Sequence, residues 1–480
     1  MHRGRGGVSP SWVVAVVALL LGMIHLGRPG LSADEGSTKA AVALPWRDLA
    51  SVLHHMDLVH GTYYALLHLW VDVAGSSAFA VRLPSAVCIA GACGLVAAVA
   101  QRLDDRRTGW YAGAASLTVP GLSWPGLDAR PAALAVLLAV LATWLLIRAD
   151  ALPTRADALP SRSRWAAYAL CLVALALTQV TALLIVLPHA LLVTRAVRRR
   201  WLGWTAAALV VLVPFVIAGR RQAEQVAWLT NGASDVVSAL GGHLTAGPAP
   251  TGAPAYASGV LLIALLALAG VGVAARSTAR GALVMWALGP PLLLLAPSLV
   301  GSSMYAERYV AWCLPAYALL VGRGLARLPG RAALIAVATL ALSAVPAWSA
   351  QRTLDAKGWE RTAELAAVVH TVERQGGAVV FLDTSTRTLA AAYPEAFVGL
   401  TDLSRAPVPP RPTALMLPDV PDADALAAVR RTHPRTVVVV YRNRAPWTGR
   451  AEMRVLARSG CALTHTETGS RNAVALWTCS

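Results

Sequence analysis

Apolar segments long enough to cross a membrane recur throughout the first 350 residues, and this feature constrains the fold more than any other. Each approaches the roughly 20 residues that a helix needs to span the hydrocarbon core of a bilayer. The segments lie at about 12–27, 78–100, 109–124, 131–147, 165–194, 203–219, 257–275, 281–299, 310–322 and 332–349. Only 14% of the 480 residues are charged, compared with about 25% in soluble proteins. The sequence therefore predicts a polytopic α-helical membrane protein.

The arginines between these segments predict the orientation of the spans, because basic loops stay on the cytoplasmic side of a membrane. Arg3 and Arg5 precede the first span, and no signal-peptidase site follows it. We therefore interpret it as an uncleaved span with a cytoplasmic N-terminus. The long segment at 165–194 contains a polar interruption, LTQVT, at 177–181. A hairpin of two short helices there places the basic cluster at 195–200 inside, which gives about 11 spans in the plasma membrane.

The region after the last span, residues 350–480, is predicted to form a small extracytoplasmic α/β domain. The remainder, 1–349, is the multi-span domain, and its first outer loop covers 28–77. The β-branched runs GAVVFLD and TVVVVYR predict strands, whereas GWERTAELAAVVHTVERQ has helical periodicity. Cys461 and Cys479 lie in the last two predicted strands. A disulfide between them is compatible with an oxidising compartment.

The net charge of +17 does not indicate a nucleic-acid partner. Most arginines lie in short loops between apolar segments, and no basic run alternates with exposed aromatic residues. Lys39 and Lys357 are the only lysines among the 42 basic residues, which we interpret as codon bias. The lipid bilayer is the partner that the composition predicts.

Ionisable residues gather at the predicted outer ends of the spans. Asp34 and Glu35 come directly after the first span. Any one such residue is typical of a solvated helix end, but together they place acids and cations on one membrane face, where their cost near the apolar core favours a function. The further candidates are Asp57, His60, Tyr63, Arg82, Asp128, Arg130, Glu307 and Arg308.

The order of these features resembles a known family. A span is followed by an Asp-Glu pair, then by D..H..YYALLHLW and AFAVRLPSA, and then by the second span. Looser agreement comes from LDARPAALAVLLAVLATWLL, from EQVAWL at 224–229 and from MYAERYVAWCLPAYALLVGRGLARL at 304–328. The chain is similar to polytopic GT-C-fold glycosyltransferases of the protein O-mannosyltransferase and aminoarabinose-transferase group, and most similar to actinobacterial mannosyltransferase-like members.

This resemblance implies an inverting transfer of a sugar, with mannose favoured, from a polyprenyl-phosphate carrier to an extracytoplasmic lipid, glycan or protein hydroxyl. Asp34 falls on the catalytic base, and Glu35 on a residue that holds the acceptor or contributes to a divalent-metal site. Arginine pairs with phosphate oxygens bidentately, so Arg82, Arg130 and Arg308 are candidates for the donor phosphate. The resemblance also implies substrate-binding roles for Asp57, His60, Tyr63, Asp128 and Glu307.

The sequence also departs from the family pattern. Gly61 and Thr62 stand where relatives have a pair of prolines, and Asp128 stands where relatives often have glutamate. His54, His55 and His60 lack the spacing of a compact metal site. No metal site is therefore assigned, and a divalent metal stays open as a cofactor.

Two alternative functions also stay open at this point. A transporter or lipid flippase for cell-envelope precursors predicts charged residues along a mid-span path and broken helices in matched halves. In this sequence the ionisable residues lie at span ends instead. A non-catalytic family member acting as a scaffold is the other alternative, and the Asp34–Glu35 pair argues against it.

Overall fold

The computed structural model describes residues 9–151, 161–222, 255–275, 277–297, 305–357, 360–372, 376–407, 409–416, 418–443 and 451–479. The chain forms two compact units. The helical unit comprises Met1–Leu26, Leu58–Tyr63 and Phe79–Arg352. The sheet unit comprises Gly27–Asp57, Tyr64–Ala78 and Thr353–Ser480. Most of the first outer loop therefore groups with the C-terminal region, although the sequence analysis assigned it to the membrane domain. The EQVAWL stretch and the N-terminal arginines lie outside the described residues.

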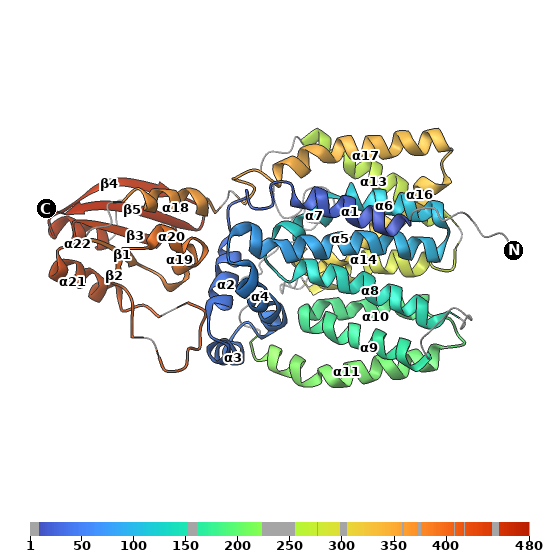
Figure 1. The fold of residues 1–480 in the computed structure, drawn as a ribbon, viewed down its shortest axis with the longest axis horizontal. Helices are drawn as coiled ribbons and strands as arrows, with labels where there is room; N and C mark the ends of the chain where they lie inside the picture. Colours follow the sequence, from blue (N-terminus) through green and yellow to red (C-terminus); the bar gives the residue numbers. More distant parts are fainter. Residues whose placement is uncertain are drawn as a thin grey trace. The chain divides into compact units, whose positions relative to one another are not determined.

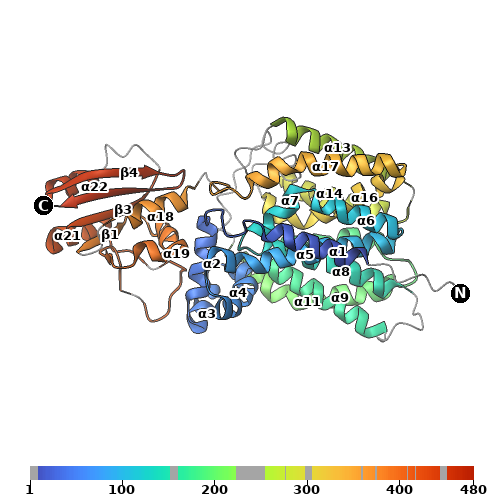
Figure 2. The ribbon, with the colours of Figure 1, turned by 45° about the horizontal axis from the view of Figure 1, so that its top comes forward.

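The helical unit is a bundle of apolar helices that run side by side (Figures 1 and 2). Its longer helices are α1 (Pro10–Met23), α5 (Ala78–Leu103), α6 (Arg106–Leu117), α8 (Ala132–Asp150), α9 (Ser161–Thr178), α10 (Val186–Leu192), α11 (Arg198–Arg220), α13 (Ala255–Ala274), α14 (Arg280–Leu295), α16 (Leu314–Arg327) and α17 (Gly330–Ala350). Short elements join or extend them: η1 (Leu58–His60), α7 (Pro120–Ser123), η2 (Trp124–Leu127), η3 (Val180–Ile185), α15 (Glu307–Val310) and η6 (Ala311–Cys313). The polytopic helical fold that the sequence predicts is confirmed.

Five helical segments among the described residues are long and apolar enough to cross a membrane by themselves, namely α5, α8, α11, α15–α16 and α17. The predicted hairpin at 165–194 is also confirmed: α9 ends at Thr178 and η3 begins at Val180. Gln179, between them, has extended backbone and lacks a helical conformation. The polar residues of the LTQVT interruption thus mark a real break in the helix.

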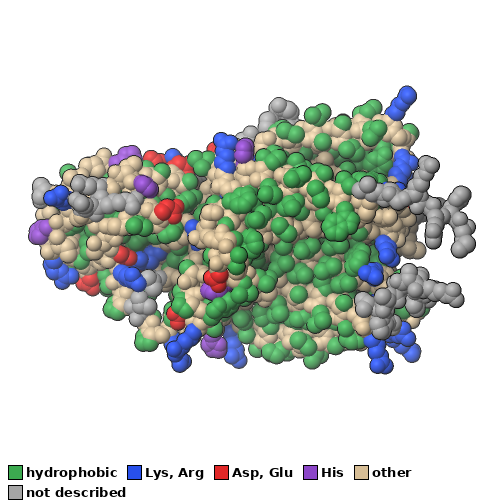
Figure 3. All heavy atoms as spheres, viewed as in Figure 1, with side chains coloured by type: hydrophobic (Ala, Val, Ile, Leu, Met, Phe, Trp, Pro, Cys, Tyr) green, Lys and Arg blue, Asp and Glu red, His purple; other side chains and the backbone are tan. Residues whose placement is uncertain are grey.

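The surface of the helical unit separates apolar from basic side chains. Figure 3 shows a face dominated by hydrophobic side chains, with basic side chains, all of them arginine in this unit, at one end. At that end Arg107 donates to the carbonyl oxygen of Leu328 at 2.7 Å. Arg323 donates to Asp104 at 3.1 Å. An apolar belt with basic residues at one end is the distribution expected of a membrane protein with cationic cytoplasmic loops.

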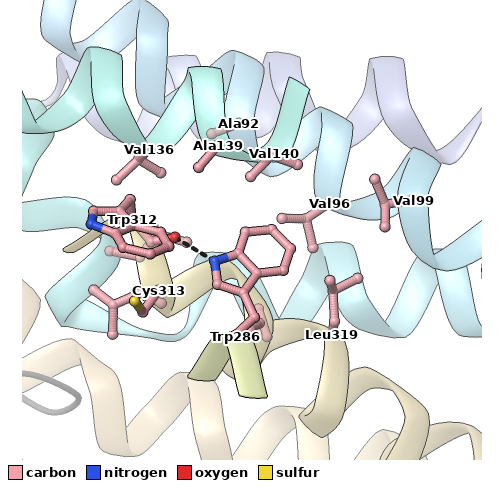
Figure 4. Close-up of a cluster of buried hydrophobic side chains, with 14 of the residues drawn as sticks. Ala92, Val96, Val99, Val136, Ala139, Val140, Trp286, Trp312, Cys313 and Leu319 are labelled. Carbon is pink, nitrogen blue, oxygen red and sulfur yellow. Dashed lines mark hydrogen bonds between the residues drawn. The ribbon is translucent and has the colours of Figure 1, made fainter. Parts of the chain in front are cut away.

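The core of the helical unit is built around two buried tryptophans (Figure 4). Trp286 of α14 donates its indole N–H to the backbone carbonyl of Trp312 in η6, at 3.0 Å. Alanine and valine side chains from α5 and α8, including Val96 and Val140, line the same cluster. Buried indoles need a hydrogen-bond partner, and the irregular η6 turn supplies a carbonyl that a regular helix would keep for itself.

The sheet unit contains a five-stranded mixed sheet in the order β2-β1-β3-β5-β4. Its strands are β1 (Gly377–Phe381), β2 (Thr401–Asp402), β3 (Thr436–Arg442), β4 (Cys461–Thr468) and β5 (Asn472–Cys479). β1 pairs in parallel with β2 and β3, whereas β5 pairs antiparallel with β3 and β4. The mixed C-terminal sheet domain expected from the two β-branched runs is confirmed.

Helices cover both faces of this sheet, which explains why β3 reads as an unbroken hydrophobic run. One core lies between the sheet and α21 (Asp422–Thr432) with α22 (Ala451–Arg458). The other lies between the sheet and α18 (Thr362–His370), α19 (Thr388–Ala392) and α20 (Pro394–Phe397). The short η7 (Thr384–Arg387) precedes α19. From the first outer loop the unit also contains α2 (Ala33–Ala43), α3 (Trp46–His55) and most of α4 (Gly61–Ala74).

Cys461 and Cys479 face each other across the β4–β5 pair, at the end of the sheet where β4 begins. They form a disulfide. The remaining described cysteines, Cys88, Cys93, Cys171 and Cys313, are free thiols within the helical unit.

Candidate functional site

The Asp-Glu pair lies in the first turn of α2, and a capping box fixes where that helix begins. Ser32 accepts a hydrogen bond from the Glu35 backbone N–H at 3.2 Å. In return, the Glu35 carboxylate accepts from the Ser32 backbone N–H at 3.0 Å. This reciprocal arrangement satisfies two of the N–H groups that a helix N-terminus leaves unpaired. Asp34, between these residues, is held half-buried on the first turn.

Glu35 is fully buried and forms an ion pair with Lys357, whose Nζ lies 2.7 Å from Oε2. The same helix carries the second lysine of the chain. Lys39 donates to the backbone carbonyl of Ala392 in α19 at 2.7 Å. Burial lowers the pKa of Lys39, and the negative charges of Glu395 and Glu35 oppose that change. Both lysines of the protein therefore anchor α2 to the C-terminal part of the sheet unit.

Asp34 has an acidic neighbour from the C-terminal region. The buried Glu360 carboxylate accepts a hydrogen bond from the Ala33 backbone N–H. The pKa of Glu360 is raised, chiefly by burial and also by the negative charge of Asp34. The hydrogen bond from Ala33 and the positive charges of Arg471 and Lys357 oppose this change. A second carboxylate, that of Glu360, thus lies near the predicted base Asp34. The positive charges of Arg471 and Lys357 offset the effect of its burial only in part.

Two further side-chain contacts, one hydrogen bond and one ring contact, lie within the first outer loop. Asp57 has a left-handed backbone, with φ of 57°. Its carboxylate accepts a hydrogen bond from the hydroxyl of Tyr64, at 3.1 Å. Aspartate tolerates this conformation better than most residues. Trp46 packs against His68, with ring centroids 4.1 Å apart.

In the helical unit, the structure brings His60 and Arg130 together. Arg130 Nη2 lies 3.2 Å from His60 Nε2, which joins η1 to the loop before α8. The Tyr63 hydroxyl lies 3.2 Å from Ser85 Oγ. Arg82 is fully buried near the start of α5 and donates to the backbone carbonyl of Leu26 at 3.2 Å. Arg82 therefore does not lie at the surface as a snorkelling arginine would.

Arg308 and Glu307 lie in α15, and the helix break of the α9–η3 hairpin positions their backbone. Gln179 donates to the carbonyl oxygen of Arg308 at 3.1 Å. Thr181 donates to that of Tyr309 at 2.9 Å. The LTQVT interruption thus has a structural role, since its polar side chains donate hydrogen bonds to carbonyls at the start of another span.

Asp128 follows the last residue of η2 and is half-buried.

The structure divides the sequence-predicted residues between the units. Asp34, Glu35 and Asp57 belong to the sheet unit, whereas His60, Tyr63, Arg82, Asp128, Arg130, Glu307 and Arg308 belong to the helical unit. Within the described ranges, no group of three or more His, Cys, Asp or Glu side chains is placed to hold a metal ion.

Sequence reasoning did not find Lys357 and Glu360. The one sequence signal for Lys357 is the rarity of lysine, which we interpreted as codon bias, and Glu360 had no such signal. When almost all basic residues are arginine, the two lysines that occur deserve a separate explanation, and both are buried around α2.

The architecture, apolar spans followed by a C-terminal mixed sheet domain, is GT-C-like. The chain is similar to ArnT from Cupriavidus metallidurans in the apo state, with a TM-score of 0.64, 14% identity and 97% of both chains covered. For ArnT bound to undecaprenyl phosphate, the TM-score is 0.62, the identity 14% and the coverage 98% of both chains. For the Archaeoglobus fulgidus oligosaccharyltransferase tethered to an acceptor peptide, the TM-score is 0.51 and the identity 12%. The similarity covers 89% of this chain and 68% of the oligosaccharyltransferase chain. No family model and no curated protein sequence matches the chain.

Proposed function

We propose that this protein is an inverting glycosyltransferase that moves a sugar, with mannose favoured, from a polyprenyl-phosphate carrier to an extracytoplasmic acceptor hydroxyl. The observation that carries the proposal is the similarity over 98% of both chains to ArnT, a protein whose structure contains bound undecaprenyl phosphate. An acid in the first turn of α2 and arginines near the ends of the membrane helices, each within its own unit, support it, because the reaction needs both a proton acceptor and a cation for the leaving phosphate.

In the proposed reaction, the acceptor hydroxyl oxygen attacks the anomeric carbon of the donor sugar. The bond between that carbon and the phosphate oxygen breaks, and polyprenyl phosphate leaves with the electron pair. The proton of the acceptor passes to Asp34, since a carboxylate within hydrogen-bond reach can act as a general base. Glu35 is already engaged with Ser32 and Lys357, so we assign it the positioning of α2 in place of acceptor binding.

Arg82, Arg130 and Arg308 are proposed to stabilise the charge that develops on the donor phosphate. The contact between His60 and Arg130 supports a shared role for this pair, because each restricts the orientation of the other. Arg130→Gln should raise the donor KM without changing protein abundance. Arg107→Gln, at the opposite basic end of the helical unit, is the matched control.

We further propose a plasma-membrane protein with a cytoplasmic N-terminus and an extracytoplasmic sheet unit. The basic loops support this orientation, as does the Cys461–Cys479 disulfide, because disulfides persist in oxidising compartments. A membrane-impermeant thiol reagent applied to intact cells, after mild reduction, should label these cysteines. Labelling only after cell lysis would indicate the opposite orientation, with the sheet unit in the cytoplasm.

The decisive experiment measures transfer from labelled polyprenyl-phosphate mannose in membranes that contain the wild type, Asp34→Asn or Asp48→Asn. Asp48 is a half-buried acid in the first turn of α3 and serves as the matched control. We expect transfer by the wild type and the control and none by Asp34→Asn. Equal transfer by all three would exclude Asp34 as the base. Transfer only from another polyprenyl-phosphate sugar would exclude mannose, and no transfer from any would contradict the enzyme class.

A further inference from the structure

Glu360 is a buried acid beside the turn of α2 that carries Asp34. Its side chain is only 3% exposed, and it comes from the segment between Lys357 and the start of α18. The carboxylate accepts a hydrogen bond from the backbone N–H of Ala33, the first residue of α2. Because Ala33 directly precedes Asp34, this bond fastens Glu360 to the same helical turn as the proposed base.

Further hydrogen bonds fix this arrangement. Before α2, the N–H of Gly30 donates to the carbonyl oxygen of Leu354 at 2.9 Å. The hydroxyl of Thr362, two residues after Glu360, donates to the carbonyl oxygen of Leu31. The two chain segments are therefore joined by three hydrogen bonds, so the acid on each segment has a fixed position.

Positive charge compensates Glu360 only in part. Arg471 Nη1 lies 3.8 Å from Glu360 Oε1, and the arginine side chain is 39% exposed, so solvent screens its charge. The Nζ of Lys357 lies 2.7 Å from the carboxylate of Glu35 and is shared with that acid. The charged groups that act on Glu360 from the elements packed around it are Asp34, Lys357 and Arg471.

The negative charge of Asp34 opposes the ionisation of Glu360. Burial is the chief cause of the raised pKa of Glu360, and the Asp34 charge adds to it. Electrostatic coupling between two acids is mutual, so an ionised Glu360 also strengthens the affinity of Asp34 for a proton. When Asp34 takes the acceptor proton, this repulsion disappears. An interaction that is relieved as the proton moves accelerates that step.

We propose that Glu360 is a positioning residue for Asp34: it holds the first turn of α2 through the Ala33 N–H and places a second negative charge beside the base. The inference rests on the proposed function, because it concerns the surroundings of that base. In the step itself the acceptor O–H bond breaks, and the proton bonds to a carboxylate oxygen of Asp34. Glu360 exchanges no atom with the substrate and acts only through Asp34.

The first test is the pH dependence of kcat and KM for transfer by Glu360→Gln and Arg471→Gln. Glutamine keeps an oxygen for the Ala33 N–H but has no charge, so the pH of half-maximal kcat should fall by about one unit. The plateau of kcat should fall several-fold, because Asp34 becomes a weaker base, whereas KM should stay unchanged. Arg471→Gln removes a cation, so the same midpoint should rise.

Opposite shifts in these two variants identify an electrostatic role, because a purely structural role would not move the midpoints in opposite directions. Glu364→Gln is the matched control, since it changes a half-buried acid in the first turn of α18. Its midpoint should equal that of the wild type. Unchanged midpoints in Glu360→Gln and Arg471→Gln would overturn the proposal.

A second test does not depend on transfer. A water-soluble carbodiimide adds to protonated carboxyl groups, so its rate of addition to Asp34 at different pH values, measured by mass spectrometry, follows the protonation of that side chain. Asp34 is half-buried and can be reached, whereas burial shields Glu360. The midpoint of Asp34 labelling should fall by about one pH unit in Glu360→Gln. An unchanged midpoint contradicts the proposal.

Amide hydrogen exchange tests the contact with α2. Glu360→Ala loses the bond to the Ala33 N–H and Glu360→Gln keeps it, so exchange in α2 should accelerate in the alanine variant alone. Equal exchange in both variants would overturn the positioning role. A labelling midpoint that shifts in a protein without transfer would refute only the proposed function. Transfer that requires Asp34 and ignores Glu360 would refute only this inference.

Discussion

Lys357 Nζ lies 2.7 Å from Glu35 Oε2, and the two side chains are 5% and 0% exposed. The pair joins the first turn of α2 to the segment that leads into α18. Breaking a buried pair on one side leaves an uncompensated charge and typically costs about 3–5 kcal/mol. We therefore expect Lys357→Met or Glu35→Gln to destabilise the sheet unit strongly.

The double variant Glu35→Gln with Lys357→Met should be less destabilised than the sum of the two single variants, because no unpaired charge remains. Amide hydrogen exchange of α2 measures this effect directly, even where transfer activity is lost in all three proteins. Additive losses across the cycle would show that the two side chains act independently.

Gly36 should tolerate no larger residue. A Cβ at this position would collide with the backbone carbonyl of Thr388 in α19. Backbone cannot move aside as a flexible side chain can, so Gly36→Ala should displace α2 from α19 and cost about 1–3 kcal/mol, the usual range for overpacking. Thermal unfolding checks this, with Gly281→Ala as the control because a Cβ there meets open space. A stable Gly36→Ala protein with unchanged hydrogen exchange in α2 would refute the close contact.

Glu360 should make stability depend on pH. Its pKa is raised in the folded state, chiefly by burial, so the folded protein holds this proton more tightly than the unfolded chain does. The associated stability is present below the unfolded pKa of about 4.3 and is lost as the pH rises through the folded pKa. Glu360→Gln removes this titration and can still accept from the Ala33 N–H.

The unfolding temperature of Glu360→Gln relative to wild type should therefore increase between pH 5 and pH 8. Parallel profiles for the two proteins would mean that Glu360 does not titrate in this range. A variant that is weakest at pH 8 would mean that the ionised carboxylate is stabilised by Arg471 and Lys357 more than burial opposes it.

His189 connects four helices through hydrogen bonds inside the helical unit. Thr143 Oγ1 lies 3.0 Å from His189 Nε2 and donates its own proton to the Ala139 carbonyl, so Nε2 carries the proton of the imidazole. Tyr168 OH then donates to Nδ1 at 3.0 Å and accepts from Trp201 at 3.0 Å. Because each donor has its acceptor, the network is complete.

His189→Leu should destabilise the helical unit by about 1–2 kcal/mol, since hydrogen bonds between membrane helices contribute up to this amount. Steric trapping or chemical denaturation in bicelles measures the loss. His54→Leu, an exposed histidine on α3, should leave stability unchanged. Equal effects of both substitutions would show that the hydrogen-bond network of His189 does not stabilise the helical unit.

The spans and the C-terminal strands follow from local pattern. Gln179 and Thr181 interrupt an apolar run that is too long for one span, and the helix ends at that point in the structure. The capping box of Ser32 and Glu35 is equally local, because its spacing is visible in the sequence. Periodicity needs only neighbouring residues, so it predicted the spans and the strands, whereas the cap was found only in the structure.

The residues that contact α2 cannot be predicted from local pattern in this way. Lys357 meets Glu35 across 322 positions, and no pattern near either residue indicates the pairing. Arg352 lies two positions beyond the last span, and only the folded structure shows that its side chain is buried. Long-range charge compensation depends on the folded arrangement, which is why the sequence indicated Asp34 as a candidate base but not the residues that surround it.

The separation of Glu35 from Lys357 also has a consequence for biosynthesis. At roughly 5–20 residues per second, a ribosome needs roughly 16–64 s to add the 322 positions between them. During that interval every span can insert while α2 still lacks its counter-ion and its packing surface on α19. A message truncated after the last span would encode all the spans but neither Lys357 nor α19, which contact α2 in the complete chain. The packing of α2 is therefore completed only after the final domain has been synthesised.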